Sequence, residues 1–531
     1  MGKKIKRWAV ADCETDAFDG REISPFVWGF IDSDGERKIF WNTAEFVEHV
    51  QAFEGMVYAH NGGRFDWLQA GVVEHLENGE VKIINSRLAS AKLGQAELRD
   101  SFLCLPAALE KFGAKMTFDY EILKRERAKD RYGKNRQKIE QYLMQDCVAL
   151  FDMMEVFIDR FGFSLTQAGA ALKTWENMGG EKRRYSVAHD EKFRPFYFGG
   201  RCEVFEYGAP LRGKFKLFDV VSMYPAGMVD IHPAGTDYYM STDYKNSPGW
   251  TFWTVDATSA GAFPVRDKHG ITFPRGRNTY HVTGWELQAA LETGTVTIHA
   301  ARGWIPRRTE TLKPYVEKFY AEKKAADESG DIVGRTISKI FLNSLYGKYA
   351  ANPAGYFDYQ IIDAGRLWAK DDAGAWVYPG WEMHAMIGES DIIRRQAKNP
   401  QYFDVALAAS ITGWARARLW RAVCASGRPI YCDTDSLLCE DLGCPEGSEL
   451  GDWKLEHDDI CAAHIAGKKL YALELKTGKY KTAHKGVSSL DIEVEDIKRI
   501  CAGEVVEIFR SAPSFKINGA QSFIDRKLRK T

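Results

Sequence analysis

Pro429-Ile-Tyr431-Cys-Asp433-Thr-Asp435-Ser436-Leu437 places two carboxylates between two short apolar runs. This pattern predicts a β-hairpin whose turn carries both acids. Such a turn presents Asp433 and Asp435 toward one point, where a divalent cation could bind between their oxygens. Taken alone, an Asp-Thr-Asp turn also fits an ordinary Asx turn with no chemical role.

A further acid lies near the end of an earlier predicted strand. Residues 215–221 have the apolar pattern of a strand, and the segment Asp219-Val220-Val-Ser-Met-Tyr224-Pro225 follows, in which the proline ends strand pairing. Asp219 and Asp435 could together hold two metal ions for nucleotidyl transfer.

Two cations and an amide lie between these segments at a spacing of four residues. Arg335, Lys339 and Asn343 therefore share one face of a predicted helix, which continues to Tyr346. A guanidinium can chelate phosphate oxygens and an ammonium adds a compact charge, so this face suits a triphosphate. Basic residues on a helix are otherwise usually just solvated.

Another set of acids occurs near the start of the chain. Residues 8–14 predict a strand, and residues two apart on a strand project to one side, so Asp12 and Glu14 can share a metal ion. Asp66 follows a second predicted strand, and two glycines just before it allow a sharp turn of the backbone.

A fourth acid belongs to a long helix predicted from about Lys134 to Phe157. Tyr142 and Asp146 lie one turn apart, so the phenol and the carboxylate point the same way. Four acids of this kind suit two Mg²⁺ ions about 3.5–4 Å apart, which would activate water for phosphodiester hydrolysis. Each acid considered singly also fits a helix cap or a surface position.

In their order, these motifs resemble those of family B DNA polymerases. D-x-E, N-x3-F-D and Y-x3-D resemble the three exonuclease motifs, and D-x2-S-x-Y-P, K-x3-N-S-x-Y-G and Y-x-D-T-D-S resemble polymerase motifs A, B and C. The resemblance implies an α/β multidomain fold, with a ribonuclease H-like exonuclease domain followed by a right-hand palm, fingers and thumb. It implies DNA-templated DNA synthesis with 3′–5′ proofreading, and two Mg²⁺ ions at each site, for which Mn²⁺ can substitute.

The resemblance also implies roles for individual residues of the exonuclease. The implied metal ligands are Asp12, Glu14, Asp66 and Asp146. The residues implied to hold the strand end are Asn61, Phe65 and Tyr142. Ser101 and Phe102 resemble the single-strand-binding motif over a shorter match, and Lys124 resembles the exonuclease lysine.

The polymerase roles follow in the same way. The implied metal site contains Asp219, Asp435, the Val220 backbone and Asp433 as a further acid. The implied nucleotide-binding residues are Tyr224, Arg335, Lys339, Asn343 and Tyr346. Tyr224 would lie beneath the sugar and leave no room for a 2′-hydroxyl, which favours dNTPs. The implied DNA contacts are Tyr197, Gly199 and Gly200 of a Y-x-G-G motif and Lys469 and Tyr471 of a K-x-Y motif.

An early first motif and two long inserts are typical of the protein-primed polymerases of bacteriophages and linear plasmids. We therefore expect an exonuclease over 1–165, a palm over 166–230 and 403–489, fingers over 311–350, a thumb over 490–531, and inserts over 231–310 and 351–402. The first insert would contact a terminal protein that serves as primer, and the second would enclose DNA. The expected partners are template-primer DNA, dNTPs, the terminal protein and a single-stranded-DNA-binding protein.

Composition adds little to these expectations. The 531 residues exceed what one core usually organises, and the net charge of −1 does not point to nucleic acid. Because the sequence has no apolar run of about 18 residues and no export signal at its polar start, we expect no membrane contact and a cytoplasmic location, in the host if the gene belongs to a phage.

Three alternatives stay open on the sequence. One is a family B polymerase that starts from nucleic-acid primers or from no primer. The others are an editing nuclease with an inactive polymerase half and a replication accessory without chemistry. The last two predict no incorporation of dNTPs on a primed template.

Overall fold

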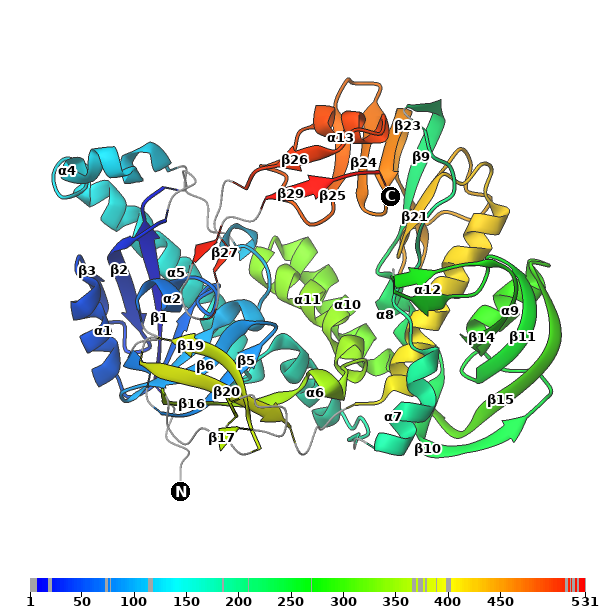
Figure 1. Cartoon of the computed structure of the whole chain (residues 1–531), viewed down its shortest axis with the longest axis horizontal. Coiled ribbons are helices and arrows are strands. Elements are labelled where there is room, and N and C mark those ends of the chain that lie inside the picture. Colours follow the sequence, from blue (N-terminus) through cyan, green and yellow to red (C-terminus); the bar gives the residue numbers. More distant parts are fainter. Residues whose placement is uncertain are drawn as a thin grey trace.

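The computed structural model of the chain describes residues 7–17, 22–71, 75–76, 78–112, 118–183, 186–208, 210–268, 270–364, 369–370, 376–377, 380–387, 389–397, 403–510, 514–515, 517, 521–522 and 525–530. The polar first six residues, on which the expected location depends, lie outside this set. Two sheet-containing units stand apart in Figure 1, and the paired helices α10 (Lys313–Ser329) and α11 (Ile332–Tyr349) lie between them.

The N-terminal unit is a mixed sheet with helices on both faces. Its elements are β1 (Trp8–Thr15), β2 (Pro25–Asp32), β3 (Arg37–Phe40), α1 (Thr43–Ala52), β4 (Met56–Ala59), α2 (Asp66–Gln69), β5 (Gly79–Ile84), β6 (Arg87–Leu93), β7 (Ala96–Asp100), α4 (Ala128–Arg131) and α5 (Arg136–Phe161). Strand β1 pairs antiparallel with β2 and parallel with β4, which pairs parallel with β7. The order β3-β2-β1-β4-β7 is the ribonuclease H-like arrangement that the sequence predicts.

Successive residues of β1 point to opposite faces of the sheet, one covered by α5 and the other by α1. Val10 belongs to the core that includes α5, whereas Ala9 and Ala11 belong to the core that includes α1. One side of α5 packs on this sheet, because Ile139, Leu143, Cys147, Leu150 and Met154 are all buried. Asp12 and Glu14 have the same parity as Val10, so they project toward α5.

The second unit is built on a seven-stranded sheet of order β25-β24-β23-β9-β22-β21-β8. Its strands are β8 (Cys202–Val204), β9 (Leu211–Val220), β21 (Tyr431–Asp433), β22 (Ser436–Cys439), β23 (Trp453–Gly467), β24 (Leu470–Leu475) and β25 (Tyr480–His484). The predicted hairpin is therefore β21–β22, and β22 lies beside β9 with Ser436 opposite Asp219. Helix α12 (Val405–Ala425) packs on this sheet through a nearly continuous buried surface.

A four-stranded antiparallel sheet of order β10-β15-β11-β14 forms most of the first insert. The elements of this region are β10 (His232–Ser241), β11 (Phe252–Ala260), β12 (Val265–Asp267), β13 (Gly270–Thr272), β14 (Arg275–Thr283), α9 (Gly284–Glu292) and β15 (Val296–Glu310). Helix α9 packs against α12, because Leu287 and Ala290 belong to the core that Ala415 and Leu419 share. The first insert is therefore attached to α12, which packs on the seven-stranded sheet.

Apart from α10, α11 and the strands of the second insert, the remaining described α-helices and strands are short. They are α6 (Gln167–Asn177), α7 (Val187–Phe193), α8 (Met223–Met228), α13 (Val494–Cys501), β26 (Val506–Ile508), β27 (Ser514–Phe515), β28 (Gln521–Ser522) and β29 (Arg526–Leu528). Helices α10 and α11 pack on the N-terminal unit, where Phe161 of α5 and Phe341 of α11 stack with ring centroids 3.9 Å apart. Among the described helices, none is both long enough and apolar enough to cross a membrane.

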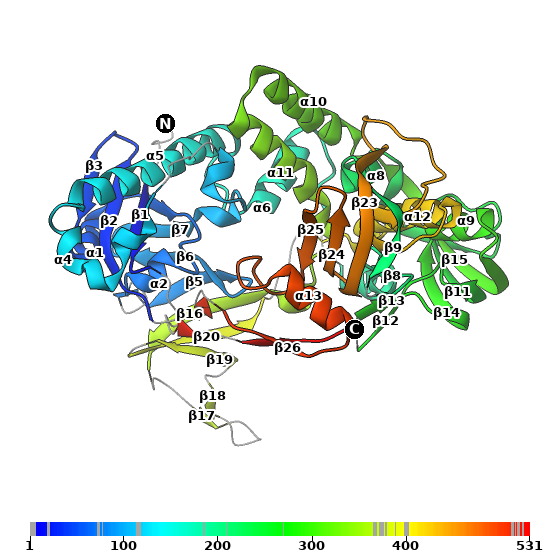
Figure 2. The same ribbon diagram turned by 90° about the horizontal axis from the view of Figure 1, so that it is seen from above.

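The second insert continues the N-terminal sheet, a connection that its sequence does not indicate. Its strands are β16 (Phe357–Asp363), β17 (Ala369–Lys370), β18 (Trp376–Val377), β19 (Glu382–Ile387) and β20 (Ser390–Gln396). Strand β16 pairs with β5, and Figure 2 shows β16, β20 and β19 lying next to it. Ile361 of β16 is buried in the core of the N-terminal unit.

The buried position of Ile361 predicts that the second insert contributes to the stability of the N-terminal unit. Ile361→Ala should lower that stability by about 2–4 kcal/mol, because it leaves a cavity in a shared core. The neighbouring Ile362 is only half-buried, so Ile362→Ala is the matched control. Thermal unfolding of both variants checks this expectation, and equal melting temperatures would contradict it.

Candidate active sites

Three of the predicted exonuclease acids meet where β1 faces α5. One carboxylate oxygen from each of Asp12, Glu14 and Asp146 lies within 4.8 Å of the other two. Asp66 begins α2 after β4, is buried, and adds a negative charge that helps to raise the pKa of Asp12. The structure thus brings together the four acids that the sequence places on two strands and a helix.

Burial and mutual repulsion disfavour negative charge in this cluster. Burial, followed by the charges of neighbouring acids, raises the pKa of Asp12 and of Glu14 well above the usual range. Burial raises the pKa of Asp66 to about 7. Asp66 Oδ1 is buried and has no hydrogen-bond partner among the described residues. An all-oxygen cluster with an unpaired buried acceptor fits a hard divalent cation such as Mg²⁺.

Tyr142 lies beside the cluster, as its helical spacing predicts. Its side chain hydrogen-bonds to Asp146, its hydroxyl lies 2.8 Å from the Tyr120 hydroxyl, and its ring stacks on Phe118 with centroids 4.1 Å apart. The phenol is therefore held between the acids and a second tyrosine. Lys124 is exposed, and its ammonium pairs with Glu121 at 2.8 Å.

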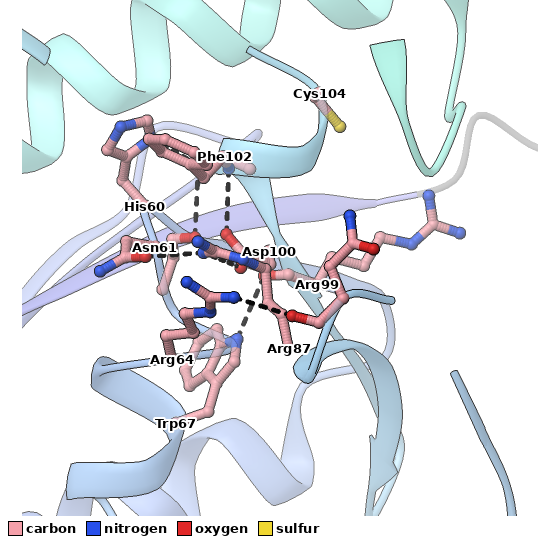
Figure 3. A network of polar contacts seen from close by, with 12 residues as sticks. His60, Asn61, Arg64, Trp67, Arg87, Arg99, Asp100, Phe102 and Cys104 are labelled. Carbon is pink, nitrogen blue, oxygen red and sulfur yellow. Dashed lines mark hydrogen bonds and ion pairs between the residues drawn. The ribbon is translucent and has the colours of Figure 1, made fainter. Parts of the chain in front are cut away.

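Asn61 and Phe102, two of the residues predicted to contact a single strand, belong to a polar network that Figure 3 shows. Asn61 has a positive φ of 65°, an unusual backbone conformation outside glycine. Phe65 meets Phe515 edge-to-face with ring centroids 5.3 Å apart. Ser101 is fully buried, and its hydroxyl donates to the Ala59 carbonyl, so it acts within the protein core.

The sequence analysis missed a central member of this network. Arg87 on β6 is buried and donates to the side chains of Asn61 and Asp100, at 2.6 Å in each case. Its guanidinium also lies 4.8 Å from the centroid of the Phe102 ring. Nothing in the local pattern marks Arg87, since its partners come from two other segments of the chain.

The second acidic site forms where β9 ends beside the β21–β22 hairpin. The Val220 N–H donates to the Asp435 carbonyl at 2.8 Å, which brings the turn next to Asp219. Burial and the charge of Asp435 raise the pKa of Asp219 to about 7, and burial also raises the pKa of Asp435. Asp219 Oδ1 is buried without a hydrogen-bond partner among the described residues, so this pair also fits a cation.

Asp433 differs from Asp219 because protein groups already occupy its oxygens. It accepts from the Tyr431 hydroxyl at 3.3 Å and from the Thr434 hydroxyl at 3.1 Å. The Lys469 ammonium pairs with it at 3.2 Å. The structure therefore places Asp433 in a bridge between the hairpin and Lys469. Tyr471 lies close by, with its ring centroid 5.2 Å from that of Tyr431.

The predicted nucleotide-binding face of α11 points outward. Arg335, Lys339 and Asn343 are all exposed on this helix, and Arg335 pairs with Asp327. Tyr224 of α8 stacks on Tyr346 of α11 with ring centroids 4.4 Å apart. The segment that follows β9 therefore contacts α11 through the stacked rings of these two tyrosines.

The Y-x-G-G segment is fixed against the hairpin and against α12. The Thr434 N–H donates to the Arg201 carbonyl at 2.6 Å, and a Cβ at Gly200 would lie 2.7 Å from the Thr434 hydroxyl oxygen. Arg416 of α12 donates to the carbonyls of Phe198 and Gly199. Arg416 also forms a buried ion pair with Glu286 of α9, so the first insert supports this segment. Sequence reasoning missed Arg416, whose only local signal is a charge within a largely apolar helix.

Comparison with known proteins identifies the family. The model of DNA polymerase type B, organellar and viral, matches residues 110–373. The DNA-directed DNA polymerase of Enterobacteria phage PRD1 is 34% identical over 571 aligned positions, which cover 100% of this chain and 99% of that protein. The chain belongs to the type B DNA polymerases. It is therefore a DNA-directed DNA polymerase, as the motifs predict.

More distant relatives agree with this assignment. The DNA polymerase of Bacillus phage Nf is 22% identical over 58% of this polymerase and 54% of its own length. The structure of Phi29 DNA polymerase complexed with primer-template DNA matches 99% of this chain and 100% of its own chain, with a TM-score of 0.74 at 17% identity. This match confirms the predicted multidomain α/β architecture, which is consistent with the expected order of an exonuclease domain followed by palm, fingers and thumb.

The raised pKa of Asp219 predicts a pH-dependent metal requirement for synthesis. Below about pH 7 its carboxyl is protonated, so a proton competes with the cation for the site. The Mg²⁺ concentration for half-maximal primer extension should rise roughly tenfold between about pH 8 and about pH 6. Magnesium titrations of primer extension at these pH values measure this shift, and a pH-independent requirement would contradict it.

Proposed function

We propose that this polymerase also edits its product with a 3′–5′ exonuclease and starts replication from a protein primer. The observation that supports editing best is the second carboxylate cluster, which lies in a different sheet from Asp219 and Asp435. The two acidic sites contain similar residues and lie in separate units. They therefore suit two opposite reactions at the 3′ end of a strand, the addition of a nucleotide at one site and its removal at the other.

In the proposed exonuclease, Asp12, Glu14, Asp66 and Asp146 hold two Mg²⁺ ions, or Mn²⁺ in their place. These ions would lower the pKa of a bound water and stabilise the charge that develops on the leaving 3′ oxygen. Tyr142 orients the attacking water through its hydroxyl, which its contacts with Asp146 and Tyr120 fix in place. Glu14 and Asp66 are buried and Asp12 and Asp146 are half-buried, and this limited access of bulk water strengthens the hold of the acids on cations.

The strand end would be held on the neighbouring network. Asn61 contributes a polar contact, and the rings of Phe65 and Phe102 provide surfaces on which unpaired bases stack. Ser101 supports this region from within, because its hydroxyl is used by the protein itself. Single strands should therefore be degraded faster than paired ends, which must first unpair.

In the proposed polymerase site, Asp219 and Asp435 hold the cations, with the Val220 backbone between them. Lys339 and Arg335 bind the triphosphate and neutralise the leaving pyrophosphate, and Asn343 extends the same face. Arg335 must leave its present ion pair with Asp327 to do so. Asp433 supports the site through Lys469.

Aromatic and glycine residues complete the proposed synthesis site. Tyr224 lies beneath the sugar and excludes a 2′-hydroxyl, and Tyr346 faces the nascent base pair. Tyr197, Gly199 and Gly200 contact the template strand, while Lys469 and Tyr471 hold the primer end. The support for the Y-x-G-G contact is the rigid attachment of this segment to the hairpin turn.

We assign the parts of the chain as an exonuclease over 1–165, palm over 166–230 and 403–489, fingers over 311–350 and thumb over 490–531. The insert over 231–310 binds a terminal protein, and the insert over 351–402 encloses DNA, which supports processive strand displacement. A single-stranded-DNA-binding protein would protect the displaced strand. The pairing of β16 with β5 supports a second insert held in place beside the exonuclease.

Substitutions at the two acidic sites should separate the two activities. Asp12→Ala combined with Asp66→Ala should abolish degradation of single-stranded DNA and spare primer extension. Asp435→Ala should do the reverse, because its site lies in another sheet. Both activities are measured on one labelled oligonucleotide, alone and annealed to a template. Loss of both activities in either variant would reject the two-site proposal.

Protein priming predicts transfer of a labelled nucleotide to a protein. With Mg²⁺, dNTPs and a candidate terminal protein from the same genome, a hydroxyl of that protein should become joined to a deoxynucleotide, with release of pyrophosphate. The Asp435→Ala variant should fail in this transfer, since the same site would catalyse it. Primer extension without any labelled protein, in a reaction that contains the terminal protein, would favour a polymerase that uses nucleic-acid primers.

A further inference from the structure

Arg87 is a buried cation that joins two residues of the proposed strand-end site. Its guanidinium donates to Asn61 Oδ1 and to Asp100 Oδ2, both at 2.6 Å. Figure 3 shows Arg87 between the side chains of Asn61 and Asp100, with Phe102 next to them. Among the described residues, only Arg87 both donates a side-chain hydrogen bond to Asn61 and places a cation over the Phe102 ring.

The chemistry of the guanidinium fixes the orientation of the Asn61 amide. Arginine has only donors, so the group that faces it must be the amide oxygen and not the amide nitrogen. The Asn61 N–H₂ group is then turned away from Arg87, where it can donate to a ligand. The hydrogen bond from Arg87 Nη1 at 2.6 Å holds the amide in this orientation.

Arg87 also restrains Phe102. The guanidinium lies 4.8 Å from the centroid of the ring, and Asp100 Oδ1 accepts from the Phe102 N–H at 3.0 Å. The His60 ring lies 5.5 Å from Phe102, and His60 Nδ1 lies 3.0 Å from the Ser101 hydroxyl. Phe102 is therefore fixed through its backbone and through one face of its ring.

The charge of Arg87 is already matched within the protein. Asp100 is fully buried and pairs with it at 2.6 Å, while Arg87 itself is 7% exposed. A buried, paired guanidinium has no free charge to offer a phosphate group in the site. Its role must then pass through the residues that it orients.

We propose that Arg87 is a positioning residue of the editing site. It turns the Asn61 amide so that the N–H₂ group donates to a phosphate or sugar oxygen near the 3′ end of a single strand. It also holds the Phe102 ring at a fixed angle for base stacking. This inference rests on the proposed exonuclease and adds a residue outside the three exonuclease motifs.

Arg87→Lys tests the proposal with little change in charge. Lysine can keep a cation beside Asp100, but it lacks the planar guanidinium whose Nη1 donates to both Asn61 and Asp100 while the group lies over the Phe102 ring. The KM for degradation of a single-stranded oligonucleotide should rise roughly tenfold or more, and kcat should change much less. Primer extension by the same preparation should stay at the wild-type level, which also shows that the variant is folded.

Asn61→Asp is an independent second test. Aspartate keeps an oxygen toward Arg87 but removes the N–H₂ donor, so KM should rise at least as much as in Arg87→Lys. Arg64→Lys is the matched control, because Arg64 is an exposed neighbour whose guanidinium donates to the Asn85 carbonyl. Its KM should equal that of the wild type.

The outcomes separate the inference from the function on which it rests. Absence of exonuclease activity in the wild-type polymerase would reject the proposed function. Wild-type activity with an unchanged KM in Arg87→Lys or in Asn61→Asp would overturn only the role of Arg87. Loss of primer extension together with the exonuclease in Arg87→Lys would also overturn it, since Arg87 would then be purely structural.

Discussion

Repulsion between buried carboxylates is the constraint on which both sites of this polymerase depend. Several acids at one point disfavour their own negative charge, so the fold must hold them there without relying on their attraction. Rigid strand ends provide this support. Asp12 and Glu14 stand on β1, an interior strand of one sheet, and Asp219 stands on β9, the central strand of another. The unpaired oxygens of Asp66 and Asp219 show where the charge of a cation would be needed.

The two sites belong to different sheets but not to independent bodies. Helix α11 carries the predicted triphosphate face and contacts both sides of the molecule. Its Tyr346 stacks on Tyr224 of α8, and its Phe341 stacks on Phe161 of the N-terminal unit. The second insert adds strands to the sheet of the N-terminal unit. In the proposed editing reaction, a strand end that moves between the two sites would pass elements that contact both units.

Much of each site could be predicted because short-range periodicity determines it. The spacing of two in β1 and of four in α5 placed Asp12, Glu14, Tyr142 and Asp146 correctly relative to one another. The hairpin turn and the exposed face of α11 followed from equally local patterns. The relation of Asp219 to Asp435 needed the family resemblance, because β9 and β22 are far apart in the sequence.

Features created by distant partners could not be predicted. Arg87 and Arg416 have no distinctive neighbours in the sequence, and their meaning comes from Asn61 and Asp100 in one case and from Glu286 in the other. The pairing of β16 with β5 joins two edge strands, and edge pairing leaves no pattern in either strand. The contacts of Asp433, predicted as a further acid of the metal site, with Tyr431 and Lys469 likewise depend on the fold.

Extension of a primed single-stranded circle tests the central claim most directly. The reaction contains Mg²⁺, dNTPs and excess trap DNA, and the length of the product is followed beyond one full circle. A polymerase that encloses its template between these units and displaces the strand ahead should produce strands many circles long. No extension, by a preparation that still degrades single strands, would contradict the account and leave an editing nuclease.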